Sequence, residues 1–135
     1  MKKAFLIIIL ISHLSCNKES SNDVVLFNPP NWIIGTWDHE NPNAALQTYV
    51  ISENNVIVFD PNNNQTNYSQ TIANDPLKTL EERIISNERY NFVILSELPN
   101  GDFSEYNVEM TKVSNNEFKL FIIGLSTGHE FFFKR

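Results

Sequence analysis

Two histidines and two carboxylates are the first side chains in this sequence that could do chemistry. His39 lies between Asp38 and Glu40, and His129 lies near the C-terminus. Imidazole and carboxylate groups bind zinc and related metals, but such a site needs three or four ligands. The chain has neither an H-x-H nor an HExxH spacing. Both histidines and one carboxylate could meet at one end of the fold, but two solvated loop histidines explain the pattern more simply. We therefore expect no metal.

Other catalytic patterns are missing from the sequence. There is no G-x-S-x-G motif, and the four glycines form no phosphate-binding loop. Glu81 and Glu82 are adjacent carboxylates, which a strand would point to opposite faces. The oxygen-rich segment 60–64 lacks the acidic spacing of a calcium loop, so we interpret it as a turn. The sequence predicts a protein that is not an enzyme and that has no cofactor.

The single cysteine, Cys16, has one obvious chemical use. It excludes an intrachain disulfide and follows a cationic start, Met1–Lys3, and an apolar run over residues 4–11. This order is typical of a secretory signal, and the run is too short for a permanent membrane span. An ordinary signal with a chance cysteine would share these features. The segment resembles a bacterial lipoprotein signal peptide, with Ser15 directly before the cysteine.

That resemblance implies a signal peptide at residues 1–15 and a diacylated Cys16 as the new N-terminus. Asn17 stands where an Asp often retains such lipoproteins at the inner membrane, so the resemblance implies a cell-envelope protein anchored in the outer membrane of a Gram-negative bacterium. Residues 17–23 are polar and predict a flexible tether, which we place at 16–31. The net charge of −6 excludes nucleic acid as a favoured partner.

The rest of the chain predicts short strands separated by turns rich in Asn, Pro and Gly. We expect strands over 33–37, 45–52, 56–59, 65–72, 90–95, 103–113, 118–123 and 130–135. Asn100-Gly101 is typical of a tight hairpin turn. Residues 75–86 fit a short helix, through a Thr79–Glu82 capping box, and a strand equally well. Val24–Phe27 could dock as an edge strand. The pattern predicts an all-β antiparallel meander of about eight strands, closed or nearly closed as a small β-barrel.

Two alternations predict which side chains share a face. Tyr106, Val108 and Met110 should face one way, since side chains alternate along a strand. Of the three rings of Phe131–Phe133, two should lie on one face and the third on the other. The outward ring could pack against the N-terminal segment or against a partner.

Gly35-Thr36-Trp37 on the first strand resembles the Gly-x-Trp motif that opens lipocalins, in particular the compact lipocalin-like domains of bacterial lipoproteins. The resemblance implies a lipocalin-like β-barrel over residues 32–135, with Gly35 and Trp37 in structural roles and the indole across the closed end. It also implies a small apolar ligand inside the barrel or a role in envelope maintenance.

Two functional hypotheses follow. In the first, a membrane-anchored envelope lipoprotein binds a small apolar ligand in a cavity lined by aromatic and aliphatic side chains. In the second, the barrel is filled, and the domain is a structural or protein-interaction module that presents an exposed apolar patch to another envelope protein. A domain of this size with many large side chains could be filled, so both hypotheses stay open.

Overall fold

The computed structural model describes residues 25–41, 43–45, 47–123 and 128–135. The prediction for Cys16, with those for the signal peptide and most of the tether, lies outside the described residues. So do the side chain of His129 and most of the turn expected at 126–128.

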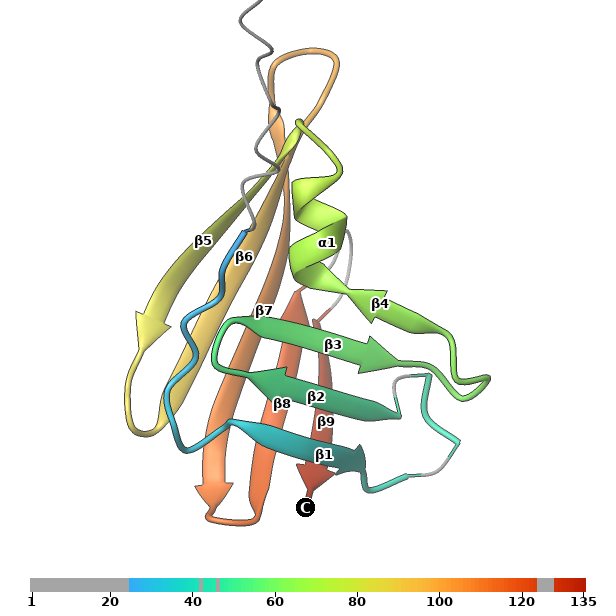
Figure 1. Cartoon of the computed structure of the whole chain (residues 1–135), viewed down its shortest axis with the longest axis vertical. Helices are drawn as coiled ribbons and strands as arrows, with labels where there is room; N and C mark the ends of the chain where they lie inside the picture. The colour runs from blue at the N-terminus through green and yellow to red at the C-terminus, as the bar shows by residue number, and fades with distance from the viewer. Residues whose placement is uncertain (1–24, 42, 46, 124–127) are drawn as a thin grey trace, which may run out of the picture.

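Nine antiparallel strands form one strongly curled sheet, a half-barrel (Figure 1). Their order is β4-β3-β2-β1-β9-β8-β7-β6-β5. The predicted antiparallel meander is therefore confirmed, and the ambiguous segment 75–86 is the strand β5. The strands are β1 (Gly35–His39), β2 (Thr48–Ser52), β3 (Asn55–Phe59), β4 (Gln65–Asn67), β5 (Lys78–Ile85), β6 (Arg89–Glu97), β7 (Phe103–Ser114), β8 (Glu117–Ile123) and β9 (Gly128–Lys134).

The strand predicted over 65–72 is wrong after Asn67, because the short helix α1 (Tyr68–Ala73) begins there. The Asn67 side chain caps this helix by accepting a hydrogen bond from the Gln70 amide at 3.0 Å. Tyr68 and Ile72 are both buried. Their spacing of four residues places them on one face of a helix as well as on one face of a strand, so the apolar pattern could not distinguish the two.

The ends of the curled sheet, β4 and β5, are bridged by other parts of the chain. The helix α1 contacts β3 and β4 on one side and β5 on the other. Residues 25–34, which we call the N-terminal strap, run beside β5. The Asn28 amide donates to Glu82 Oε1 at 2.8 Å, and the Trp32 indole donates to the Ser86 carbonyl at 2.8 Å.

Phe27 docks the strap into the core, where the ring is only 1% exposed and lies edge-on to Phe92. Its amide donates to the Asn54 carbonyl at 3.1 Å. The docking expected for Val24–Phe27 thus occurs at Phe27, but residues 25–30 have irregular backbone and do not form an edge strand. Two prolines directly after Asn28 explain this, since Pro cannot donate to a strand ladder.

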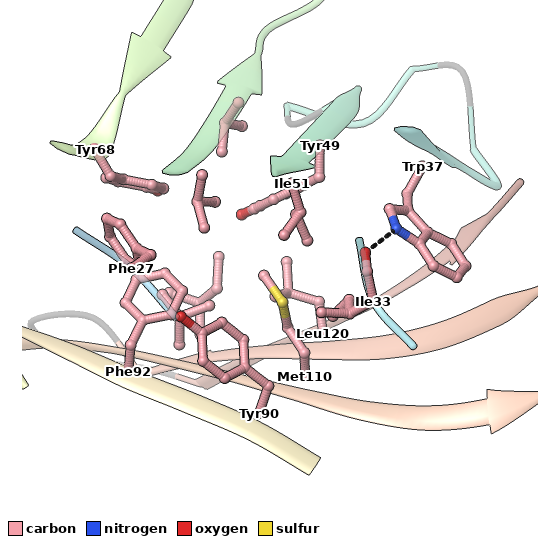
Figure 2. Close-up of a cluster of buried hydrophobic side chains, with 14 of the residues drawn as sticks. Phe27, Ile33, Trp37, Tyr49, Ile51, Tyr68, Tyr90, Phe92, Met110 and Leu120 are labelled. Carbon is pink, nitrogen blue, oxygen red and sulfur yellow. Dashed lines mark hydrogen bonds between the residues drawn. The ribbon is translucent and has the colours of Figure 1, made fainter. Parts of the chain in front are cut away.

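Large side chains fill the interior of the half-barrel (Figure 2). The largest fully buried ones include Trp37, Tyr49, Tyr90, Phe27, Phe92, Phe118 and Phe133. The predicted common face of Tyr106, Val108 and Met110 is confirmed, because all three contribute to this core. Phe131 and Phe133 also belong to the core, whereas Phe132 is 38% exposed on the opposite face. The expected division of the three rings is confirmed.

Candidate ligand-binding site

A surface cavity of about 430 Å³ lies between the β1–β2 connection and β9. It exists because β1 pairs with β9 only at Asp38–Lys134 and His39–Phe133, with one further bond from the Glu40 amide to the Phe132 carbonyl at 3.0 Å. Beyond this point the β1–β2 connection leaves the sheet. The cavity is lined by His39, Glu40, Asn41, Ala44, Ala45, Glu130, Phe131 and Phe132.

The walls of the cavity combine apolar surface with one imidazole. Ala44, Ala45, Phe131 and Phe132 contribute the apolar part, with the Phe131 ring packed against the core and the Phe132 ring on the opposite face of β9. Asn41 shapes the connection: its side-chain oxygen accepts from the Asn43 amide at 2.9 Å, and its carbonyl accepts from the Ala44 amide at 3.1 Å. Ala45 was expected in a strand over 45–52, but β2 begins only at Thr48. The sequence therefore did not indicate that Ala45 lines a cavity.

The position and tautomer of His39 follow from its contacts. The ring lies edge-on to Phe133 at 5.0 Å and to Phe131 at 5.6 Å between centroids. Its Nδ1 accepts a hydrogen bond from the Asn41 amide at 2.8 Å. A nitrogen that accepts carries no proton, so the ring proton is on Nε2. Nε2 is buried and has no hydrogen-bond partner among the residues that the structure describes.

An unpaired buried donor costs about 1–3 kcal/mol. An acceptor atom placed against Nε2 would recover that free energy. His39 lines the cavity, but its Nε2 is covered by protein, so a ligand oxygen with a free lone pair would reach this donor only after neighbouring side chains moved.

The acidic side chains at the rim are matched by lysines. Glu40 forms an ion pair with Lys134 at 2.7 Å, and Glu130 forms one with Lys119 at 2.9 Å. The hydrogen bond from Lys134 lowers the pKa of the Glu40 carboxyl, which is therefore ionised at neutral pH. These pairs leave no excess positive charge to attract an anion.

The residues that were considered and rejected as metal ligands are only partly brought together. His39 and Glu40 line the cavity, but the Asp38 side chain is exposed and accepts from the Thr48 hydroxyl at 2.8 Å. No group of three or more His, Cys, Asp or Glu side chains is arranged for a metal ion within the described part of the chain.

The interior holds a second polar feature, formed by three tyrosines. The Tyr68 and Tyr106 hydroxyls are 3.1 Å apart. The Tyr49 hydroxyl is fully buried and without a hydrogen-bond partner in the described part of the chain. Burial raises the pKa of all three phenols above the usual value of 10.0, and the increase is large for Tyr49 and Tyr68. They are neutral at any physiological pH and supply polar contacts inside an otherwise apolar core.

Gly35 and Trp37 lie at one end of the core and not in the cavity. The Trp37 ring is fully buried, and its indole N–H donates to the Ile33 carbonyl at 2.7 Å (Figure 2). Gly35 has a φ of +144°, a conformation that side chains with a Cβ rarely adopt.

Among the described residues, none of the helical structure is long and apolar enough to span a membrane. No protein-family model, no curated protein and no solved structure matches this chain.

Proposed function

We propose that this chain is a lipid-anchored envelope protein whose domain binds a small, mostly apolar molecule carrying one hydrogen-bond acceptor. The observation that carries the proposal is the buried Nε2–H donor of His39 beside the apolar walls of the 430 Å³ cavity. Small-molecule sites usually measure about 300–1,000 Å³ and combine apolar lining with a few placed polar groups. The site lies at the side of the filled half-barrel, between β1 and β9, and not in its centre.

The chemistry of the rim narrows the ligand class. Glu40 and Glu130 stand at the mouth, and the whole chain carries a net charge of −6. A carboxylate or phosphate would find no unpaired cation there, since Lys134 and Lys119 are already paired with Glu40 and Glu130, and an anion that is desolvated without a partner is unfavourable. A neutral carbonyl, such as that of an ester, ketone or amide, fits both the donor and the charge. The ligand class we assign is a neutral apolar carbonyl compound.

The lipid anchor belongs to the same proposal. It is supported by the order of charge, apolar run and Cys16 in the sequence. The lipocalin-like assignment is supported by the curled all-β sheet that follows, with which it is compatible. The location we propose is the outer membrane of a Gram-negative envelope, and it is supported by Asn17 after the cysteine.

The test is a binding comparison between matched ligands. We expect aliphatic esters to bind the full-length protein about tenfold more tightly than alkanes of equal length, measured by displacement of an apolar fluorescent probe, because one neutral hydrogen bond contributes about 1 kcal/mol or more. His39→Phe keeps an aromatic ring and removes the donor, so it should abolish the preference while alkane binding persists. Thr36→Ala, on the exposed face of β1, is the matched control. An unchanged preference in His39→Phe would refute the assignment.

A second function is favoured by the filled interior. The buried aromatic cluster occupies the space in which a lipocalin-like barrel would hold its ligand. In this alternative the domain is a structural or protein-interaction module of the envelope. A photo-reactive side chain at the outward position Phe132 would then crosslink one defined envelope protein in cells, and the probe would be displaced by neither ester nor alkane.

A further inference from the structure

Three exposed apolar side chains gather at the end of the molecule that carries the β6–β7 turn. Leu77, Leu98 and Phe103 are 52%, 39% and 58% exposed. Glu97 shows that the three residues are neighbours. Its amide donates to the Leu77 carbonyl at 2.9 Å, and it lies opposite Phe103 in the pairing of β6 with β7. Leu98 is the next residue in the chain. We call Leu77, Leu98 and Phe103 the apical cluster.

The direction of the N-terminal strap shows which end of the domain is nearer the proposed anchor. Asn28 contacts Glu82, and Trp32 contacts Ser86, so the strap runs parallel to β5. Its first residue, Val25, therefore lies toward the start of β5, which is the end that carries the apical cluster (Figure 1).

Covalent geometry limits how far the domain can be from the membrane. Eight residues lie between Cys16 and Val25, so nine residue-to-residue steps join them. An extended chain spans at most about 3.3–3.6 Å per step, so the link is no longer than about 32 Å. The chain enters the domain at the apical end. A bilayer that holds the lipid on Cys16 is therefore within reach of the apical cluster.

We infer that the apical cluster inserts into the interfacial region of the bilayer and acts as a second membrane contact beside the lipid. This inference rests on the lipid anchor of the proposed function. Leucine and phenylalanine are the side chains that amphipathic surfaces bury at the boundary between headgroups and acyl chains. An extra contact of this kind would orient the domain, with the end of the core that holds Trp37 directed away from the membrane.

The charged side chains around the apical cluster indicate which lipid headgroups it can contact. Asp75, Glu97 and Asp102 surround the cluster, and Lys78 is already paired with Asp75 at 2.6 Å. An acidic surface gains nothing from anionic headgroups. The occupant is therefore a zwitterionic phospholipid surface, and the contact should be apolar and insensitive to salt.

The test compares two labelled positions in the full-length protein. Phe103→Cys and, as a control, Val113→Cys are labelled with a thiol-reactive fluorophore and reconstituted in phosphatidylcholine vesicles with spin-labelled acyl chains. Val113 is 54% exposed, close to the 58% of Phe103, but lies by the β7–β8 turn at the opposite end. Leu98→Cys gives a second reporter at the apical end, and the wild-type chain shows any labelling of Cys16.

We expect quenching by the acyl-chain labels to be at least about threefold stronger at residues 103 and 98 than at 113, and unchanged by salt. Equal quenching at both ends would overturn the inference, as would quenching that needs anionic lipid and disappears in salt. The intact mass of the protein reports the lipid on Cys16 separately. If that mass shows no lipid, the anchor is wrong, and flotation of the chain with the vesicles decides whether the apical cluster binds a bilayer by itself.

Discussion

The Arg135 guanidinium lies 4.3 Å from the centroid of the Trp37 ring and joins the C-terminus of the chain to its first strand. The same group donates to the Asn115 carbonyl at 2.7 Å and to the Ile34 carbonyl at 3.3 Å. The side chain of Arg135, which directly follows β9, thus contacts both β1 with the residue before it and the β7–β8 turn. The end of the core that Trp37 fills is closed from outside by a cation.

Arg135→Ala should lower the free energy of unfolding by about 1–2 kcal/mol, because a cation–π contact and charge-assisted hydrogen bonds are lost together. Arg135→Lys should recover only part of this loss, since an ammonium lacks the planar donor fork. Urea unfolding measures both. Arg89→Ala, which removes an exposed ion pair with Glu109, is the control and should change stability by about 0.5 kcal/mol or less. Equal effects at Arg89 and Arg135 would contradict this role.

Gly35→Ala should destabilise the protein for two separable reasons. A φ of +144° disfavours any residue with a Cβ, and the new methyl group would lie 3.4 Å from Arg135 Nη1. Gly101→Ala has the same unfavourable backbone conformation, at a φ of +82°, but its new methyl group would have no neighbouring atom within 4 Å. We expect about 1–3 kcal/mol of strain at each position.

A double-mutant cycle separates the two reasons. In an Arg135→Ala background Gly35→Ala should cost less than in the wild type, whereas Gly101→Ala should cost the same in both. Thermal or urea unfolding of the five variants gives the comparison. If the losses in the free energy of unfolding caused by Gly35→Ala and Arg135→Ala simply add in the double variant, the new methyl group does not disturb the guanidinium.

Phe27→Ala should cost about 3–5 kcal/mol, because it removes a fully buried ring from the core and detaches the strap. Leu26→Ala, one residue earlier, is the matched control: its side chain is 58% exposed, so the change should stay within about 0.5 kcal/mol. Hydrogen exchange should also become faster in β5 for Phe27→Ala alone. Similar stabilities of the two variants would mean that the strap does not contribute to the fold.

The four tyrosines predict a steep loss of stability at alkaline pH. Burial raises the pKa of Tyr49, Tyr68, Tyr90 and Tyr106 in the folded protein, and the bond to Glu82 adds to the effect at Tyr90. In the unfolded chain these phenols ionise near pH 10. Their contribution is therefore complete below pH 10 and declines above it, by about 1.4 kcal/mol per pH unit for each phenol.

Tyrosinate absorbance at 295 nm against pH measures this coupling. Since the chain has only these four tyrosines, we expect no ionisation step near pH 10 in the folded protein. The absorbance should rise in one step that coincides with unfolding seen by circular dichroism. If the absorbance of one or more tyrosines rises at a pH below that of unfolding, those phenols are accessible in the folded state.

Local sequence patterns predicted the strands because apolar and polar residues alternate clearly along the segments that form them. Tyr106, Val108 and Met110 alternate with polar residues along β7, so their common face was predicted correctly. The hairpin was predicted at the right place, but residues 98–102 form a longer loop in which Gly101 and not Asn100 has a positive φ, so the tight turn is wrong. The helix α1 was missed since Tyr68 and Ile72 fit both periods, and only the Asn67 cap distinguishes them. Over residues 78–85 the apparent capping box was overridden by pairing of β5 with β6.

The candidate site could be predicted only in part, because it depends on long-range geometry. The sequence singled out His39 and Glu40 only as ligands of a metal site that was considered and rejected in favour of solvated loop histidines, so it did not indicate a ligand cavity there. The cavity arises where the β1–β2 connection leaves β9, at a register between residues more than 90 positions apart. No local pattern encodes that register. The tautomer of His39 depends on the local backbone conformation after β1, which brings the Asn41 amide to Nδ1.

The central claim, that the His39 cavity holds a neutral apolar carbonyl compound, is tested most directly by native mass spectrometry of the full-length protein purified from the cells that naturally produce it. We predict an added mass that organic extraction removes, that contains a carbonyl group, and that is absent from His39→Phe. The lipid that we propose on Cys16 would be covalent and should survive the extraction. A protein that carries no extractable mass, together with failure of esters to bind it, would contradict the claim and favour a filled interaction module.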